Sequence, residues 1–320
     1  MILWGVAMVR NEEDIVEAFV RHNLTILDGM LIVDHNSTDR TLAILTALRA
    51  ERLPLVVKRH EAPGYLQAEI TTSAAREVFA RTPADFVFPL DADEFLKVGR
   101  RAELERYLKS LPPDTHPVFD WPTYAPPFDG DGRDVVACAR AARRLTGRSR
   151  GTGKVAVARS FAANPGAYIG QGNHEVYVGN KPQTARRLPM VGAPAAFCVA
   201  HLPARSAVQH ARKFGVRRLA RIAGGRDYPT DSNFYQAFAQ LRAGRTPTPD
   251  DMLRPYVDGF FVLKDAQPPT SAPAVDDPFI ADIVLRYTPP PADDALPTVL
   301  AAVEGLTRRL AAYRKGAKRA

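Results

Sequence analysis

The first hundred residues alternate short apolar runs with segments whose apolar residues recur every three or four positions. Four apolar runs predict buried β-strands, at residues 2–9, 30–33, 55–57 and 85–90. The segments between them predict amphipathic helices, at residues 16–27, 42–48 and 67–80. This alternation predicts an α/β fold with a doubly wound, mostly parallel sheet flanked by helices.

The pattern becomes weaker after residue 96. Helices are predicted at residues 101–111 and 206–223, and strands at residues 117–124, 154–160, 195–200 and 283–287. Eight prolines between residues 268 and 297 predict an extended segment. The last predicted helix, residues 298–315, carries on one face Val299, Val303, Leu306 and Leu310.

Helix caps are predicted at two positions. Either Ser37 or Thr38 in the polar turn after the second strand is the expected N-cap of the second helix, and Ser206 is the expected N-cap of the helix at 206–223. Each of these side chains can accept a hydrogen bond from a free backbone N–H of the first helical turn.

The composition is that of an ordinary globular protein. The chain has 320 residues, 46% hydrophobic and 24% charged, which excludes a disordered chain and allows one large domain or two small ones. No apolar run reaches the ~18–20 residues that a membrane-spanning helix needs. Residues 1–9 lack the basic start and cleavage site of a signal peptide. Cys138 and Cys198 are expected to be free thiols in a reducing compartment, so we predict a cytoplasmic protein.

Polar clusters follow three of the predicted strands, at residues 10–12, 34–39 and 91–94. Because the carboxyl ends of parallel strands lie at one edge of a doubly wound sheet, these clusters are expected to lie close together. Ligands bind at this edge in such folds. The sequence therefore predicts an active site there.

The third cluster places Asp91, Asp93 and Glu94 directly after a buried strand. Neighbouring carboxylates repel one another, which favours a cation between them, and oxygen ligands suit Mg²⁺ or Mn²⁺. The alternative is a solvated acidic turn that caps the next helix. The position of the acids beside two other polar clusters favours the metal site.

Three stretches of the chain resemble glycosyltransferase family 2, whose members use nucleotide-sugar donors and have the GT-A fold. These stretches are residues 6–12 (VAMVRNE), 32–41 (IVDHNSTDRT) and 89–95 (PLDADEF), and a weaker resemblance continues through residues 172–176 and 201–206. The turn after the second strand reads Asp34-His35-Asn36-Ser37, which is similar to the surface or capsular polysaccharide branch rather than to the commoner Asp-Asp-Gly-Ser pattern.

The resemblance implies a division of the chain into three parts. Residues 1–265 would form the glycosyltransferase domain, with a nucleotide-sugar-binding half at 1–96 and a smaller mixed acceptor-side half at 97–265. The proline-rich segment at 266–297 and a basic C-terminal helix at 298–320 would follow.

The resemblance also implies a donor-binding set. Asp34 would contact the nucleotide base. The rest of the base pocket would come from Val9, Arg10, Asn11 and Glu12. The other residues expected to bind the donor are Asn36, Asp39, Ala92 and Arg205.

A divalent metal is implied at the acidic cluster. Asp91 would bind the ribose hydroxyls or the metal, and Asp93 would hold the metal on the donor diphosphate. His201, at the end of a predicted strand, would complete the metal shell; the alternative is a histidine that only satisfies its own hydrogen bonds. A metal there neutralises the charge that develops on a diphosphate leaving group.

An inverting sugar transfer also needs a base for the acceptor hydroxyl. The glycine-rich stretch at 170–175 ends in His174 and Glu175, and Glu175 is the first acid after a long acid-free segment. We expect Glu175 or His174 to be the base, with Glu94 and Asp93 as other candidates. The alternative for His174 and Glu175 is a hydrogen-bonded pair that only shapes the turn.

The net charge of +8 is unevenly distributed. Three segments without any acid, residues 135–174, 201–226 and 308–320, hold 20 of the 43 lysines and arginines. They predict either solvated faces or binding surfaces for the donor diphosphate, an anionic glycan or lipid-linked acceptor, or an anionic membrane. They lack interleaved aromatic residues, so nucleic acid is not an expected partner.

The sequence therefore predicts a metal-dependent nucleotide-sugar glycosyltransferase, inverting, with Mn²⁺ or Mg²⁺ as cofactor and a glycan or lipid-linked acceptor. It is expected in the cytoplasm, with contact to the inner face of the membrane as one role for the basic segments. The alternatives are a nucleotide-sugar-binding module without catalysis and a nucleotidyltransferase. The acidic segment after the first strand disfavours the latter, which would have a glycine-rich basic loop there.

Overall fold

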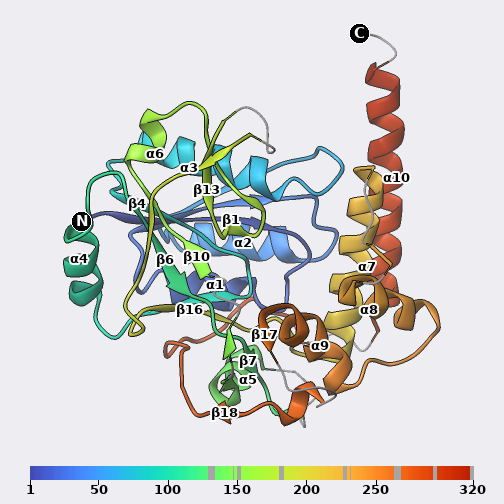
Figure 1. Cartoon of the computed structure of the whole chain (residues 1–320). Coiled ribbons are helices and arrows are strands. Elements are labelled where there is room, and N and C mark those ends of the chain that lie inside the picture. Colours follow the sequence, from blue (N-terminus) through green and yellow to red (C-terminus); the bar gives the residue numbers. More distant parts are fainter. Residues whose placement is uncertain are drawn as a thin grey trace.

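The computed structural model describes residues 1–128, 134–146, 148–149, 153–179, 184–225, 229–230, 232–262, 268–290 and 294–317 (Figure 1). Its central sheet contains the four predicted strands, β1 (Leu3–Val9), β2 (Gly29–Asp34), β3 (Leu55–Arg59) and β4 (Phe86–Pro89). They are all parallel, in the order β3-β2-β1-β4, and the short β11 (Val157–Ala158) pairs antiparallel with β4. The predicted α/β fold with a doubly wound parallel sheet is confirmed.

Helices cover both faces of this sheet. Helices α1 (Val16–Asn23) and α2 (Thr41–Ala50) lie on one face, and α3 (Gln67–Arg81) lies on the other (Figure 1). The strand β1 alternates accordingly: Ala7 packs in the cluster of α1 and α2, whereas Val6 packs in the cluster of α3. This period of two explains why a continuous apolar run marks a strand that is buried on both faces.

The turn after β2 differs from the cap prediction. Helix α2 begins at Thr41, whose N–H donates to Asp39 Oδ1 at 2.9 Å, so neither Ser37 nor Thr38 is its N-cap. Instead, Ser37 Oγ accepts from Asn11 N at 3.0 Å, and Thr38 N donates to Asn11 Oδ1 at 2.7 Å. These bonds hold Asn11 at φ 55° and tie the ends of β1 and β2 together.

The second half of the domain adds a mixed sheet in the order β10-β6-β16-β5, with β15 beside β6. Its strands are β5 (Glu94–Lys97), β6 (His116–Asp120), β10 (Gly153–Val155), β15 (Met190–Gly192) and β16 (Cys198–His201). The pairing of β16 with β5 sets His201 opposite Glu94, 107 positions apart in sequence. Topology thus joins the late histidine to the acidic cluster.

Shorter elements complete the chain. The remaining strands are β7 (Tyr124–Ala125), β8 (Arg143–Leu145), β9 (Arg148–Ser149), β12 (Ala167–Ile169), β13 (Val176–Val178), β14 (Arg186–Arg187), β17 (Phe261–Val262) and β18 (Ala274–Val275). The remaining helices are α4 (Arg101–Lys109), α5 (Val135–Ala141), α6 (Ser160–Ala163), α7 (Ala207–Ala223), α8 (Asn233–Arg242), α9 (Pro249–Phe260) and α10 (Leu296–Ala317), with 3₁₀ turns η1 (Gln171–Asn173) and η2 (Pro269–Ser271). Ser206 Oγ accepts from Gln209 N at 3.1 Å, which confirms the predicted cap of α7.

The strand predicted at residues 283–287 is wrong. This segment is irregular and bends at residues 286–287, where the buried Glu17 carboxylate of α1 accepts from the backbone N–H groups of Arg286, Tyr287 and Thr288 at 2.8 Å each. A side chain therefore supplies the acceptors that a neighbouring strand would have supplied. These bonds, together with Arg21, hold the pKa of Glu17 below its usual value despite its burial.

The C-terminal helix α10 packs against α7, as Figure 1 shows. Its buried residues include Ala302 and Leu306, whereas Val303 is 38% exposed, so the predicted apolar face is only partly right. In the part of the chain that the structure describes, no helix combines the length and apolar character needed to cross a membrane.

A buried histidine makes stability sensitive to acid. His22 Nε2 donates to Leu96 O at 2.7 Å and its Nδ1 accepts from Ala281 N at 2.9 Å, so the neutral ring fits both partners. Burial lowers the pKa of His22 to about 4. The unfolded chain binds the proton near pH 6.5 and the folded chain only near pH 4, so stability is lost as the pH falls through this window.

We expect His22→Gln to flatten the pH dependence of the unfolding free energy, measured in urea between pH 7 and 4. The decrease in unfolding free energy between pH 7 and 4 should be smaller than in the wild type by on the order of 3 kcal/mol. An unchanged slope would show that His22 does not carry this acid sensitivity.

Candidate active site

A pocket of about 200 Å³ lies at the carboxyl ends of β1, β2 and β4, with α7 along one side. This is the sheet edge where the three polar clusters were expected to meet. The predicted site residues that line it are Arg10, Asn11, Glu12, Asp91, Ala92, Asp93, His174 and His201.

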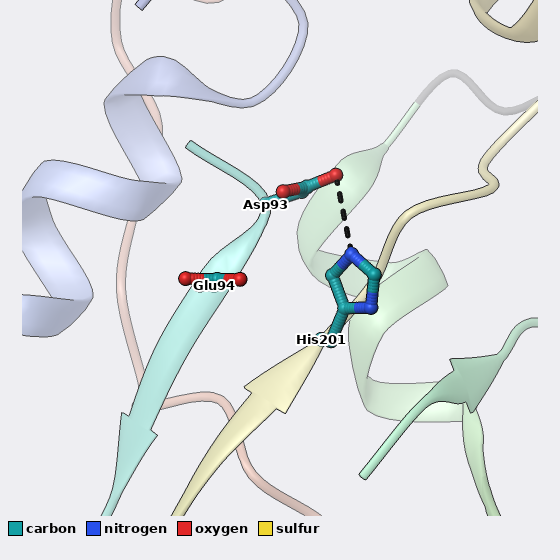
Figure 2. Close-up of side chains that lie close together, drawn as sticks. All are labelled: Asp93, Glu94 and His201. Carbon is teal, nitrogen blue, oxygen red and sulfur yellow. Dashed lines mark ion pairs between the residues drawn. The ribbon is translucent and has the colours of Figure 1, made fainter. Parts of the chain in front are cut away.

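The acidic cluster lies at one end of this pocket, where Asp93 and His201 line the cavity and Glu94 lies behind them. Asp93, Glu94 and His201 are all buried, and each offers a ligand atom within 4.8 Å of the others. Figure 2 shows Asp93 facing the His201 ring, with His201 Nε2 3.7 Å from Asp93 Oδ2. The Trp121 ring stacks on His201 with 4.3 Å between centroids and fixes its orientation.

Two lysines, the buried Lys154 and the half-buried Lys213, balance the charge of these acids. Lys154 is 1% exposed; its Nζ lies 2.6 Å from Glu94 Oε1 and 3.0 Å from Asp91 Oδ2. Lys213 on α7 forms an ion pair with Asp93. Burial alone would lower the pKa of both lysines, but the carboxylates beside them raise it above the usual value, so both stay charged.

Two glutamates at the pocket have strongly shifted acidity. Burial raises the pKa of Glu94 to about 8, against the opposing effect of Lys154. Burial likewise raises the pKa of Glu12 to about 7, although Lys213 and Arg205 oppose it. Carboxyl groups that titrate near neutral pH are a common feature of functional sites.

The cluster has the donor set that a divalent cation requires. Carboxylate oxygens from Asp93 and Glu94 and an imidazole nitrogen from His201 suit Mn²⁺, and carboxylates also suit Mg²⁺. The second ring nitrogen of His201, Nδ1, is buried and has no hydrogen-bond partner. These residues therefore fit a divalent metal.

The loop between β12 and β13 holds Asp91 in place. Asp91 Oδ1 accepts from Gln67 Nε2 at 2.5 Å and from Asn173 Nδ2 at 3.4 Å. Gly172 has a φ of 81°, and its N–H donates to Gln67 Oε1. Its carbonyl oxygen accepts a hydrogen bond from Lys154 Nζ at 2.7 Å. This turn needs a residue that tolerates positive φ, and glycine does so without strain.

His174 and Glu175 separate at the end of this loop. His174 lines the pocket, and its Nδ1 donates to Gly153 O at 2.7 Å, which leaves Nε2 with a lone pair. Burial lowers the pKa of His174 to about 4. Glu175 pairs with Tyr177 and Arg187, and the described lining residues do not include it.

Several other predicted residues lie behind the pocket wall. The Arg205 guanidinium is buried against Asp14 at 2.8 Å and Glu12 at 3.2 Å. Asp39 caps α2 and pairs with Arg212 at 3.2 Å. The others that do not line the pocket are Val9, Asp34 and Asn36, at or after the ends of β1 and β2. Arg205 and Asp39 support the wall through their ion pairs with Glu12 and Arg212, whereas Asp34 keeps one buried carboxylate oxygen, Oδ1, without a partner.

Sequence analysis missed lining residues that come from distant parts of the chain, namely Gln67, Trp121, Lys154, Lys213 and Tyr256. The two lysines belong to the acid-free basic segments. The signal that could have found them is charge complementarity, because an acidic cluster without enough nearby cations needs partners from elsewhere.

Comparison of the sequence with protein-family models and with curated proteins finds no match. Among solved structures, S. aureus TarS 1-349 in complex with UDP is 13% identical, with a TM-score of 0.37 over 76% of this chain and 72% of that chain. The mannosyltransferase PcManGT from Pyrobaculum calidifontis in complex with GDP-Man and Mn²⁺ is 15% identical, with a TM-score of 0.36 over 99% of this chain and 79% of that chain.

Glucosyl-3-phosphoglycerate synthase from Mycobacterium tuberculosis, in complex with Mn²⁺, UDP and glucosyl-3-phosphoglycerate, is 17% identical, with a TM-score of 0.27 over 51% of this chain and 58% of that chain. All three TM-scores are low, so these similarities carry no argument about function. The pocket residues of this chain carry it instead.

Proposed function

We propose that the protein is a metal-dependent glycosyltransferase that moves a sugar from a nucleotide-diphosphate donor to a glycan or lipid-linked acceptor. The observation that carries the proposal is the buried cluster of Asp93, Glu94 and His201, of which Asp93 and His201 line a pocket at the carboxyl ends of the parallel strands. The family 2 resemblance of residues 6–12, 32–41 and 89–95 supports it, because these stretches border the same pocket.

Each part of the pocket has a role in this reaction. A divalent cation, Mn²⁺ or Mg²⁺, held by Asp93, Glu94 and His201 would neutralise charge on the leaving diphosphate. Lys213 adds a positive charge at the same end. Asp91, fixed by Gln67 and Lys154, faces the donor from a rigid position.

The transfer proceeds with inversion in one displacement. The acceptor hydroxyl oxygen attacks the anomeric carbon, the bond from that carbon to the diphosphate oxygen breaks, and the hydroxyl proton goes to a base. We favour His174 as this base because its Nε2 lone pair lies on a residue that lines the pocket, whereas Glu175 is engaged by Tyr177 and Arg187.

The remaining assignments stay predictions. They are the surface-polysaccharide branch, the division at residues 96, 265 and 297, a cytoplasmic location and a contact between the C-terminal basic segment and an anionic membrane. Residues 318–320 of that segment lie outside the described residues.

A thermal-shift screen of nucleoside diphosphates tests the function. A ligand that binds only the folded chain raises the melting temperature, so at least one nucleotide should raise it, and more so with Mn²⁺ present. The matched control is the corresponding nucleoside with Mn²⁺, which lacks the diphosphate. No response to any nucleotide, with or without metal, would contradict the proposal.

A further inference from the structure

Arg10 at the other end of the pocket, and Arg309 on the nearby helix α10, have buried guanidinium atoms without a partner. All three guanidinium nitrogens of Arg10, which lines the pocket, are buried and make no hydrogen bond, and the same holds for Nε and Nη2 of Arg309 on α10. Burial and the charge of Arg309 lower the pKa of Arg10 to about 10. The two guanidinium groups repel each other, and these buried N–H donors have no acceptor. Such an arrangement indicates that a ligand with hydrogen-bond acceptors binds between them.

Unpartnered acceptors lie beside these donors. Asp34 Oδ1 is buried without a partner, and its charge acts on both arginines. His35 Nε2 donates to Ala62 O at 2.9 Å, so its Nδ1 carries a lone pair, and that atom is also buried without a partner. The cluster therefore offers both donors and acceptors to a ligand.

The C-terminal helix lies beside this cluster at Gly305. A Cβ added at Gly305 would lie 3.4 Å from Thr38 Cγ2 and 3.1 Å from Arg309 Nη2. These distances place α10 next to the turn after β2, with the Arg309 side chain folded back along its own helix. From this position the charge of Arg309 acts on Arg10, and the charge of Asp34 acts on Arg309.

We propose that Arg309 is a nucleobase-binding residue, so that α10 forms part of the donor pocket. This rests on the proposed function. Arg10 and Arg309 would donate to carbonyl oxygens of the base, and Asp34 Oδ1 would accept from its ring N–H. A base with both groups, uracil, thymine or guanine, satisfies this set, whereas adenine has no carbonyl. A phosphate fits poorly because Asp34 and the His35 lone pair repel it.

Calorimetric titration of Arg309→Gln with UDP, GDP, ADP and inorganic pyrophosphate, each with Mn²⁺, tests this role. We expect the wild type to prefer UDP or GDP over ADP. Arg309→Gln should weaken the preferred nucleotide by roughly tenfold, the loss of one buried charge-assisted hydrogen bond, and leave pyrophosphate binding unchanged. Pyrophosphate has no base, so it would contact only the metal end of the pocket. Its affinity therefore reports on phosphate contacts alone, and a loss seen only with the nucleotide reports on base contacts.

Arg308→Gln is the matched control, because Arg308 is the next residue on α10 and its side chain is 82% exposed beside Glu304. It should bind as the wild type does. Melting temperatures of the variants check folding.

Three outcomes would overturn the proposal. They are wild-type nucleotide affinity in Arg309→Gln, an equal loss of pyrophosphate binding in Arg309→Gln, and a wild-type preference for ADP. If the wild type binds nucleotides and Arg309→Gln binds them equally well, only the role of Arg309 fails. If the wild type binds none of the nucleotides, the proposed function fails as well.

Discussion

Replacing Asp93 by asparagine is expected to reduce sugar transfer by roughly 100- to 1000-fold or more, the cost of losing one preorganised charge-stabilising group at a leaving group. Asp93 is buried and lies between His201 and Lys213 at the metal end of the pocket. The amide keeps the size of the side chain but removes the charge that holds a cation. Turnover of a nucleotide-sugar donor, measured with saturating Mn²⁺, checks this.

The matched control is Asp282→Asn, because the Asp282 side chain is 98% exposed and does not line the pocket. This variant should retain wild-type turnover. Asp93→Asn also leaves Lys213 without its carboxylate, which can destabilise the fold. The double variant Asp93→Asn/Lys213→Met removes both charges and should fold but remain inactive. Wild-type turnover in a folded Asp93→Asn variant would favour a site without metal, and would contradict the proposed mechanism.

Replacing Lys154 by methionine is expected to lower the free energy of unfolding by about 3–5 kcal/mol, the usual cost of breaking a buried ion pair from one side. Lys154 is 1% exposed and touches Asp91, Glu94 and the Gly172 carbonyl. Its ammonium also lies 4.6 Å from the centroid of the Trp121 ring. Methionine fills the volume of the side chain but leaves Asp91 and Glu94 without the ammonium group that pairs with both. Urea denaturation at neutral pH measures the loss.

Lys58→Met is the control for a pair at the surface. Lys58 pairs with Glu77, but its side chain is 41% exposed, and exposed pairs contribute little to stability. The double variant Lys154→Met/Glu94→Gln should recover part of the loss, because it removes one of the unpaired carboxylates. A loss for Lys154→Met no larger than that for Lys58→Met would show that the buried pair does not stabilise the fold.

The strands of the central sheet and the sheet edge that carries the site could be predicted from local pattern. A short apolar run such as residues 2–9, followed directly by polar residues, is typical of a strand buried on both faces, and the polar residues after it then lie at a known edge. The clusters at residues 10–12 and 91–94 could therefore be predicted to lie together without any knowledge of the second half of the chain, and both contribute lining residues to the pocket.

Long-range pairing could not be predicted in this way. Arg205 contacts Asp14, 191 positions away, and Lys213 contacts Asp93, 120 positions away. In sequence these cations belong to an acid-free segment that resembles a solvated or ligand-binding face. In space they neutralise the acids of the other half, which sequence spacing alone does not reveal.

The late strand failed for a related reason. Residues 283–287 have the apolar pattern of a strand, but a strand also needs a partner, and here the Glu17 carboxylate accepts the backbone hydrogen bonds instead.

The direction of a side chain in a loop could not be predicted either. His174 and Glu175 are adjacent in sequence, but of these two only His174 is among the described residues that line the pocket. The two neighbouring side chains point in different directions, so the His174 ring lines the cavity and the Glu175 carboxylate pairs with Tyr177 and Arg187 instead.

The central claim is that the pocket binds a nucleoside diphosphate together with a divalent cation held by the acidic cluster. The most direct measurement is a calorimetric titration of the nucleotide that the thermal-shift screen selects, into the wild type and into Asp93→Asn/Lys213→Met, each with Mn²⁺ and with a chelator. We predict tight binding only in the wild type with Mn²⁺. Binding of equal affinity without metal and in the double variant, or no binding in the wild type, would contradict the claim.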